Sequence, residues 1–299
     1  MSSCLQRNVV LNTAVEQLWS HAISSRTKIV YNVGYDHFQN FLLLHGIQVG
    51  NILPPISEDI LIYFVAYCFN SLKLQYSTIK LYLCGIRYMY LRFNSCNPFE
   101  TNDNKSLPRL SLILKSVKRI QGLHVRTRLP ITFDILEKIC YKLRTGVFGN
   151  FVDILIECVC IVAFFGFLRC SEFSVLSSDK FYNASNLCTS DVSFYQSYAI
   201  LRLKESKTDP FRKGVNIHLH KVKHSICPFS ALEKYFSVRA KRSSQNFATE
   251  PLFITEFNQA LERKYFLEKL KHVYVASIRH CTTDIPLDQA LQLVLVKPI

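Results

Sequence analysis

An apolar run that ends at an arginine constrains this chain more than any other feature. The run covers Phe151–Leu168, and Arg169 and Glu172 follow it closely. An apolar segment of this length forms either a buried core helix or a membrane span. Asp153 and Glu157 lie inside the run, and each is costly at bilayer depth. Because polar residues also end the run abruptly, we expect a core helix.

The arginine at the end of this run needs an anionic partner. A guanidinium that lies next to a buried element without such a partner costs several kcal/mol. A phosphate held between the planar donors of Arg169 is one partner of this kind. The run therefore predicts a buried helix that presents an arginine to an anion.

The charge balance indicates a polyanionic partner. The 299 residues carry a formal net charge of +14, and 49% of them are hydrophobic. This length allows two domains, and this apolar content allows large cores. Nucleic acid is the simplest polyanion that fits. An anionic membrane surface would require a basic amphipathic helix, and none stands out.

The cysteines indicate a reducing compartment. The chain has 11 cysteines but no Cys-x-x-Cys pair, and its one close pair is Cys158 and Cys160. On a helix these two point to different faces, so we expect small buried side chains rather than zinc ligands or disulfides. Met1–Val10 lacks the apolar stretch of a secretory signal. We therefore expect an intracellular protein, cytosolic or nuclear.

The first part of the chain has the apolar spacing of helices. The expected helices cover Val9–Ile23, Ser25–Leu44, Ser57–Phe69, Tyr76–Phe93 and Leu107–Gln121. Ser24 or Ser25 can cap the second of these helices, and Ser57 opens the third. A loop with Pro54-Pro55 separates the second helix from the third. These elements predict a helical N-terminal domain over 1–121.

The fourth of these helices has a basic face and no acid. Lys80 and Arg87 are two turns apart and share this face. The residues expected on its core side are Ile79, Leu81, Ile86 and Met89. The basic face is either a solvated surface or a set of phosphate contacts, and the sequence leaves both interpretations open.

A second basic stretch, Lys105–Arg128, covers the fifth helix and extends into a linker. It has seven basic residues and no acid: Lys105, Arg109, Lys115, Lys118, Arg119, Arg126 and Arg128. Its last part, 122–131, contains Gly122 and Pro130 and predicts an interdomain linker. A basic linker suits a clamp in which the chain crosses a duplex and holds its backbone without reading its sequence.

The second part of the chain mixes helices with strands. The expected helices cover Phe133–Leu143, Phe148–Phe167, Cys227–Arg239 and Leu261–Val275. The expected strands cover Asp191–Tyr195, Tyr198–Leu203, Gly214–Leu219 and Pro251–Ile254. Residues 204–213 form the tip of a hairpin between the second strand and the third. The predicted fold class is α+β, mainly α with a small β-sheet.

The segment Gly166–Glu172 resembles the first arginine box of the tyrosine recombinase (phage integrase) family, whose core reads Gly-Leu-Arg-x-x-Glu. The longer segment Phe164–Phe173 looks most like the eukaryotic DIRS-type retroelement branch. This resemblance implies a helical SAM-like core-binding domain, a catalytic domain, double-stranded DNA as partner and no cofactor or metal. It also implies DNA recombination and integration, in which a tyrosine attacks the scissile phosphate to give a 3′-phosphotyrosine link.

The resemblance extends to the hairpin tip. Ser206-Lys207-Thr208 is similar to the family's second element, a β-hairpin whose lysine acts on the leaving oxygen. The resemblance implies Arg169 and Lys207 as catalytic residues, with Glu172 as support. Together with the basic stretches, it also implies a set of DNA-binding residues: Lys80, Arg87, Lys115, Lys118, Arg119, Arg126, Arg128, Arg212 and Lys213.

Two parts of the family's site are not identifiable in this sequence. None of the nine histidines is followed by arginine three residues later, as the family's His-x-x-Arg box requires. No tyrosine follows Tyr274, although the nucleophile is expected in that part of the chain. From about Val273 the sequence stops resembling the family, which indicates truncation or divergence. We therefore expect a linker at 122–131, a partial catalytic domain at 132–272 and a divergent tail at 273–299.

The incomplete site leaves three interpretations open. The chain is a recombinase completed in trans, as a homo-oligomer or as a hetero-oligomer with an intact relative. It is instead a non-catalytic DNA-binding regulator, or a dominant-negative partner of an intact recombinase. In the third interpretation it is a degraded element without stable function. The resemblance to a eukaryotic element and the DNA partner predict a nuclear location and no membrane association.

Overall fold

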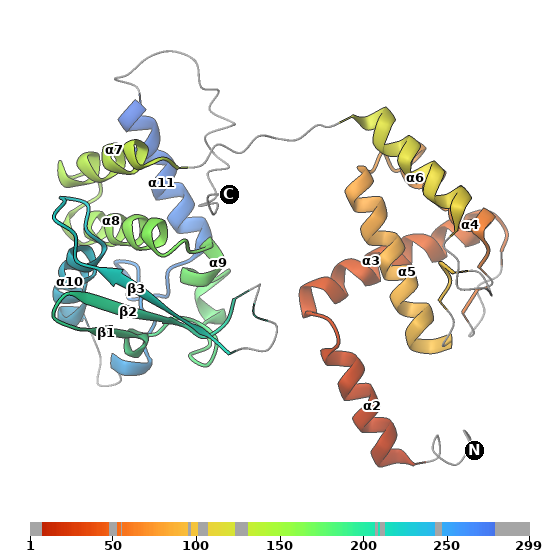
Figure 1. Cartoon of the computed structure of the whole chain (residues 1–299), viewed down its shortest axis with the longest axis horizontal. Helices are drawn as coiled ribbons and strands as arrows, with labels where there is room; N and C mark the ends of the chain where they lie inside the picture. The colour runs from red at the N-terminus through yellow and green to blue at the C-terminus, as the bar shows by residue number, and fades with distance from the viewer. Residues whose placement is uncertain are drawn as a thin grey trace. The chain divides into compact units, whose positions relative to one another are not determined.

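The computed structural model separates the chain into two compact units, residues 1–126 and 127–299. Figure 1 colours the first unit from red to yellow and the second from green to blue. In the part of the chain that the structure describes, no helix is long and apolar enough to cross a membrane. The described residues are 8–47, 53–54, 56–94, 97–100, 107–122, 131–206, 209, 213–242 and 247–278.

The described part of the first unit is helical, as the apolar spacing predicted. Two of the helix starts have the serine caps expected from the sequence: Ser24 Oγ accepts the Thr27 amide, and Ser57 Oγ accepts the Ile60 amide. The helices are α2 (Val9–His21), α3 (Ser25–Leu44), α4 (Glu58–Asn70), α5 (Tyr76–Asn94) and α6 (Pro108–Gln121).

Helices α3 and α5 pack closely because each has a glycine at the crossing. A Cβ on Gly34 of α3 would lie 2.6 Å from the Tyr82 Cα, and one on Gly85 of α5 would lie 2.4 Å from the Tyr31 carbonyl oxygen. No larger residue fits at either position without moving a backbone. The core that this contact closes includes Phe38, Leu42, Leu61, Phe64, Ile79 and Ile86.

The prediction that Leu81 lies on the core side of α5 was wrong. Ile79 and Ile86 are fully buried and Met89 is partly buried against the core, but Leu81 is 45% exposed. Two residues correspond to a rotation of about 200° around an α-helix. Leu81 therefore lies nearly opposite Ile79, and it shares the outer side of α5 with the basic residues.

The second unit has helices on one side of a small antiparallel sheet. The helices are α7 (Phe133–Arg144), α8 (Asn150–Phe165), α9 (Cys170–Phe173), α10 (Pro228–Arg239) and α11 (Arg263–Ile278). The short 3-10 turns are Ser178–Lys180, Thr189–Asp191, Ala240–Arg242 and Phe247–Thr249. The strands are β1 (Val192–Phe194), β2 (Tyr198–Leu203) and β3 (Val215–His220). The structure therefore confirms the predicted α+β fold class.

The sheet has the order β1-β2-β3, with Val192 opposite Leu201 and Tyr198 opposite His220. Its inner face belongs to one core cluster with α7, α8, α10 and α11. The inner residues alternate along the strands with outward-facing ones, as the period of two requires. They are Ala199, Leu201, Leu203 and Leu219.

The predicted strand Pro251–Ile254 is wrong as a strand, although its burial is as expected. Leu252, Phe253 and Ile254 are buried. The segment makes only isolated bridges, from Pro251 to Cys188 and from Ile254 to Ala260. Because these bridges go to two different neighbours, no ladder extends along the segment.

Helix α8 is the central core helix that the apolar run predicted. Most of its residues are buried, including Cys158 and Cys160, and burial raises the pKa of both thiols well above the ordinary range. Its two acids are paired. Asp153 accepts the backbone amides of Val147, Phe148 and Gly149, and Glu157 pairs with the side chains of Arg144 and Lys234.

The last described helix passes the point where the sequence predicted a divergent tail. Helix α11 continues to Ile278, and Val273 and Tyr274 are buried in the core of the second unit. Both side chains complete the same apolar cluster as α7 and α8. The fold therefore uses residues on both sides of the boundary that we placed at 272–273.

Candidate functional site

The chain leaves α8 through a tight turn that leads to Arg169. The amides of Phe167 and Leu168 donate to the carbonyls of Phe164 and Ala163, which closes the helix end. Phe167 has a positive φ of 50°, a position that usually belongs to glycine in this turn. The predicted helix Phe148–Phe167 therefore ends early, at Phe165, and a strained residue comes two positions before Arg169.

Arg169 already has partners within the chain, in addition to any external anion. Its Nη1 donates to Glu172 Oε1 at 2.9 Å and to Ser206 Oγ at 3.0 Å. The Ser206 hydroxyl donates to the same Glu172 oxygen at 2.8 Å, and the Arg169 amide donates to Glu172 Oε2 at 2.8 Å. These contacts form a closed triangle of guanidinium, carboxylate and hydroxyl.

The triangle joins two segments that are 37 residues apart in the chain. Arg169 and Glu172 come from the start of α9, and Ser206 comes from the hairpin between β2 and β3. The Glu172 side chain is only 7% exposed, whereas that of Arg169 is 30% exposed. Within the described residues, the guanidinium bonds all use Nη1. Nε and Nη2 thus remain for a further anion.

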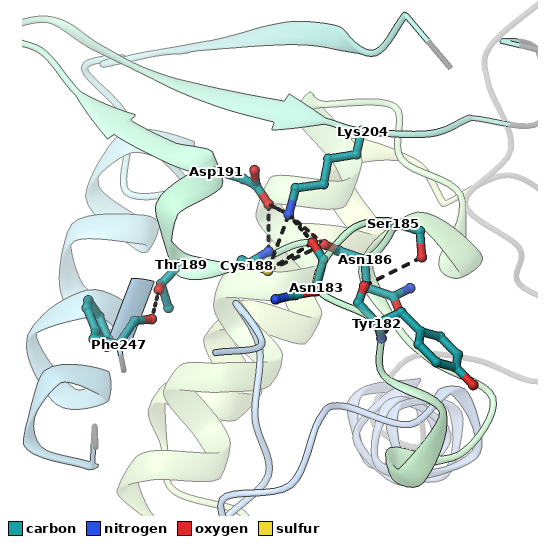
Figure 2. Close-up of polar contacts among 9 residues, drawn as sticks. All are labelled: Tyr182, Asn183, Ser185, Asn186, Cys188, Thr189, Asp191, Lys204 and Phe247. Carbon is teal, nitrogen blue, oxygen red and sulfur yellow. Dashed lines mark hydrogen bonds and ion pairs between the residues drawn. The ribbon is translucent and has the colours of Figure 1, made fainter. Parts of the chain in front are cut away.

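The base of the hairpin is fixed by Lys204, as Figure 2 shows. Its Nζ lies 2.7 Å from Asp191 Oδ2 and 3.3 Å from Cys188 Sγ. It also donates to the carbonyls of Asn183 at 2.7 Å and Asn186 at 3.1 Å. Lys204 therefore ties the strand end to the loop that precedes β1, and it has a structural role that the sequence did not reveal.

The charge of Lys204 is stabilised by its surroundings. Burial acts to lower the pKa of Lys204, but the hydrogen bonds and charge of Asp191 outweigh it, so the pKa is raised. Burial also raises the pKa of the neighbouring Cys188 thiol, against the opposing effect of Lys204. The pair therefore holds a charged lysine beside a neutral thiol. The sequence offered one signal for this contact, which is that an acid, Asp191, directly precedes β1 while Lys204 directly follows β2.

Further contacts hold the loop and the hairpin in place. Thr189 donates to the carbonyl of Phe247, which anchors the loop from the other side (Figure 2). On the hairpin, Asp209 Oδ2 accepts the amide of Gly214 at 2.7 Å, and Gly214 has a positive φ of 72°. A residue with a side chain would be strained at Gly214, so the glycine sets where β3 begins.

In the first unit, Lys80 of α5 and Lys118 of α6 converge on one ring. Their Nζ atoms lie 5.8 Å and 5.9 Å from the centroid of Tyr76. Gln121 fixes the junction, because its Oε1 accepts the Tyr76 amide at 2.7 Å and its Nε2 donates to the Leu74 carbonyl at 2.8 Å. The sequence identified both lysines but not their approach to each other.

The other predicted site residues are distributed differently. Arg87 lies 3.9 Å from Glu100, so its charge already has a partner in the chain. Lys115 and Arg119 are exposed on α6, and Lys213 is exposed beside the hairpin. Lys207, Arg126, Arg128 and Arg212 lie outside the described residues. Of the three predicted catalytic residues, the structure therefore brings together Arg169 and Glu172.

A metal site is not formed by the residues that the structure describes. No group of three or more His, Cys, Asp or Glu residues among them is close enough to hold an ion. The described polar groups at Arg169 are a guanidinium, a carboxylate and a hydroxyl. Such a set can bind and orient a phosphate through charge-assisted hydrogen bonds.

Comparison with known proteins gives a likeness of fold. No family model and no curated protein sequence matches this chain. The XerH site-specific recombinase bound to palindromic difH substrate, in a post-cleavage complex, matches with a TM-score of 0.52 at 17% identity, over 88% of this chain and 65% of that one. Its pre-cleavage complex with difH matches with a TM-score of 0.52 at 16% identity, over 89% and 66%.

The chain has a tyrosine recombinase-like fold. At these identities the likeness concerns the fold alone, and it confirms the architecture expected from the arginine box. The chain spans less than two thirds of the length of each XerH chain. On this fold, Arg169 and Glu172 lie at α9, just after the central helix, and Ser206 lies on the hairpin that follows β2.

Proposed function

We propose that this chain is a recombinase-like DNA-binding protein that holds duplex DNA and directs Arg169 at a backbone phosphate. The triangle of Arg169, Glu172 and Ser206 is the observation that supports this proposal most strongly. It joins the arginine box to the hairpin on a tyrosine recombinase-like fold. Lys207 is the next residue in the sequence, and we assign it the role of the family's hairpin lysine.

The chemistry of the triangle fits phosphate binding. Glu172 and Ser206 hold Nη1, so the guanidinium is oriented while Nε and Nη2 stay available for two phosphate oxygens. An arginine oriented in advance loses less side-chain entropy when the phosphate arrives. Glu172 and Ser206 thereby act as positioning residues, and Arg169 is the residue that contacts the phosphate.

The first unit supplies a second point of contact in this proposal. Lys80 and Lys118 project from two helices beside Tyr76, and Lys115 and Arg119 are exposed on α6. Such charges bind phosphates in any sequence and position the duplex. We assign 1–121 and 132–272 as two domains that hold the duplex. The basic residues of 122–131 cross it between them.

We infer that a polypeptide of this sequence does not cut and rejoin DNA by itself. Its 299 residues contain neither a His-x-x-Arg box nor a tyrosine after Tyr274. When catalytic groups act as a unit, the loss of one removes most of the rate acceleration. Arg169 therefore cannot replace a missing nucleophile. We propose that it acts as a non-catalytic regulator or in an oligomer with an intact recombinase. We place it in the nucleus and derive it from a DIRS-type retroelement.

Binding to duplex DNA across a salt series tests the proposal. The logarithm of the affinity should fall linearly with the logarithm of the salt concentration, by about 0.9 per phosphate contact. The variant Lys118→Ala should reduce this slope by about 0.9. Lys264→Ala is the matched control, because Lys264 is an exposed lysine of α11. No binding by the folded protein would contradict the proposal.

A search for a covalent protein–DNA adduct tests the inferred lack of cleavage. The protein is incubated with nicked and intact duplexes and analysed under denaturing conditions. We expect no adduct from this chain alone. An adduct that survives denaturation would show that a nucleophile is present, and the non-catalytic role would then be wrong.

A further inference from the structure

The outer face of the sheet has a row of aromatic rings that the duplex-binding residues do not use. The rings of Tyr195 and Tyr198 are stacked, with centroids 4.7 Å apart and an angle of 13°. The ring of Tyr198 also contacts those of His218 at 5.5 Å and His220 at 5.6 Å. These residues form one continuous patch, which we call the ring row.

The ring row faces solvent. In the register of the sheet, Tyr198 is opposite His220, and Ile200 is opposite His218, on the face away from α8 and α10. Tyr195 is 48% exposed, and both histidines are exposed. Cross-strand contacts between rings stabilise a sheet. This structural role alone does not explain why the rings are exposed.

The charge of this face is positive. Residues 192–194, 198–203 and 215–220 contain no acid. Arg202 lies on the same face as Tyr198, at the hairpin end of β2, and is exposed. Arg202 also lines a hollow of about 620 Å³ at the base of the hairpin, together with Lys204, Lys213 and the acids Asp191 and Glu205. The face therefore combines flat rings with cations at one end.

We propose that the ring row and Arg202 bind single-stranded nucleic acid. Exposed rings offer stacking partners to unpaired bases, whereas the bases of a duplex already stack on each other. Cations beside the rings attract the phosphates of the same strand. A protein partner would find few apolar side chains on this face and no acid on its three strands. None of the rings belongs to the triangle of Arg169, Glu172 and Ser206, so this proposal goes beyond the proposed duplex binding.

Anisotropy with a labelled oligothymidine of about 12 nucleotides tests this site. Each ring that stacks on a base should contribute at least about fivefold to affinity. Tyr195→Ala and His220→Ala should each weaken oligothymidine binding by this factor and change duplex binding by less than about twofold. Arg202→Ala should lower the salt slope for the single strand by about 0.7.

Tyr141→Ala is the matched control, because Tyr141 is an exposed tyrosine on α7 away from the sheet. Thermal unfolding shows whether each variant is folded. If a ring variant does not fold, Arg202→Ala tests the site in its place. Equal oligothymidine affinity in Tyr195→Ala, Tyr141→Ala and the parent, or no oligothymidine binding by the parent, would overturn the proposal. Ring-dependent oligothymidine binding without duplex binding would support this site and contradict the proposed duplex function.

Discussion

At its first turn α8 holds Asp153 against three backbone amides, whereas beyond its last turn it leads to Arg169, whose guanidinium is only partly paired. Asp153 is buried and accepts from Val147, Phe148 and Gly149. Arg169 uses Nη1 for Glu172 and Ser206 and is 30% exposed. Asp153 belongs to the first turn of this apolar helix, and Arg169 follows its end.

The difference separates a structural charge from one that we assign to binding. A buried carboxylate that accepts several amides satisfies the backbone, and its burial keeps a ligand away from it. A half-exposed guanidinium held by one nitrogen keeps its other donors for an anion. The following substitutions test whether the two ends of α8 differ in this way.

The largest effect is expected at the first turn. Asp153→Ala removes the acceptor of three partly buried amides and should lower the free energy of unfolding by about 3–5 kcal/mol. Asp134→Ala is the control, because Asp134 is an exposed acid in the first turn of α7, and its loss should cost less than about 1 kcal/mol. Urea denaturation measures both. Similar losses in the two variants would show that the amides do not depend on Asp153.

A smaller effect is expected for the carboxylate beyond the last turn. Glu172→Ala leaves Arg169 and Ser206 without their shared acceptor and should cost about 2–3 kcal/mol, because Arg169 is still reached by water. Glu172→Gln keeps one acceptor oxygen and should cost less. Glu268→Ala, in an exposed pair with Lys264, should cost below about 0.5 kcal/mol. If Glu172→Ala leaves the free energy of unfolding unchanged, the triangle does not contribute to stability.

The hydroxyl that joins the hairpin to this carboxylate should matter less again. Ser206→Ala removes a neutral donor and acceptor and should cost about 1 kcal/mol, while Ser206→Thr should retain most of the stability. Ser193→Ala, on the exposed face of β1, is the control and should be neutral. Denaturation midpoints of the three variants give the comparison. If Ser206→Thr and Ser206→Ala lose the same amount of stability, the Ser206 hydroxyl is not the group that stabilises the hairpin.

The smallest change should stabilise the protein. Phe167→Gly relieves a left-handed backbone at the end of α8, and the ring it removes is 54% exposed. We expect a gain of about 1 kcal/mol in the free energy of unfolding. Phe165→Gly, two residues earlier at the last position of α8, should instead destabilise the protein, because glycine is a poor helix former. A loss in Phe167→Gly would show that the ring contributes more than the strain costs.

Local patterns in the sequence predicted the elements well. Serine caps placed the starts of α3 and α4, and alternation placed β2 and β3, because caps and periodicity depend on neighbours within a few residues. Local patterns failed where distant residues decide. The segment after Pro251 has strand-like residues but pairs with two different neighbours, so it forms only bridges.

The site shows the same division. By itself, the sequence determined the central apolar helix and the Arg169–Glu172 spacing that lets the carboxylate accept from the arginine. Only the tertiary structure decided that Ser206 closes the triangle, that Lys204 holds the loop at Asp191, and that Lys80 meets Lys118. Spacing along the chain fixes contacts within one turn of a helix. Contacts between remote segments depend on how the whole core packs.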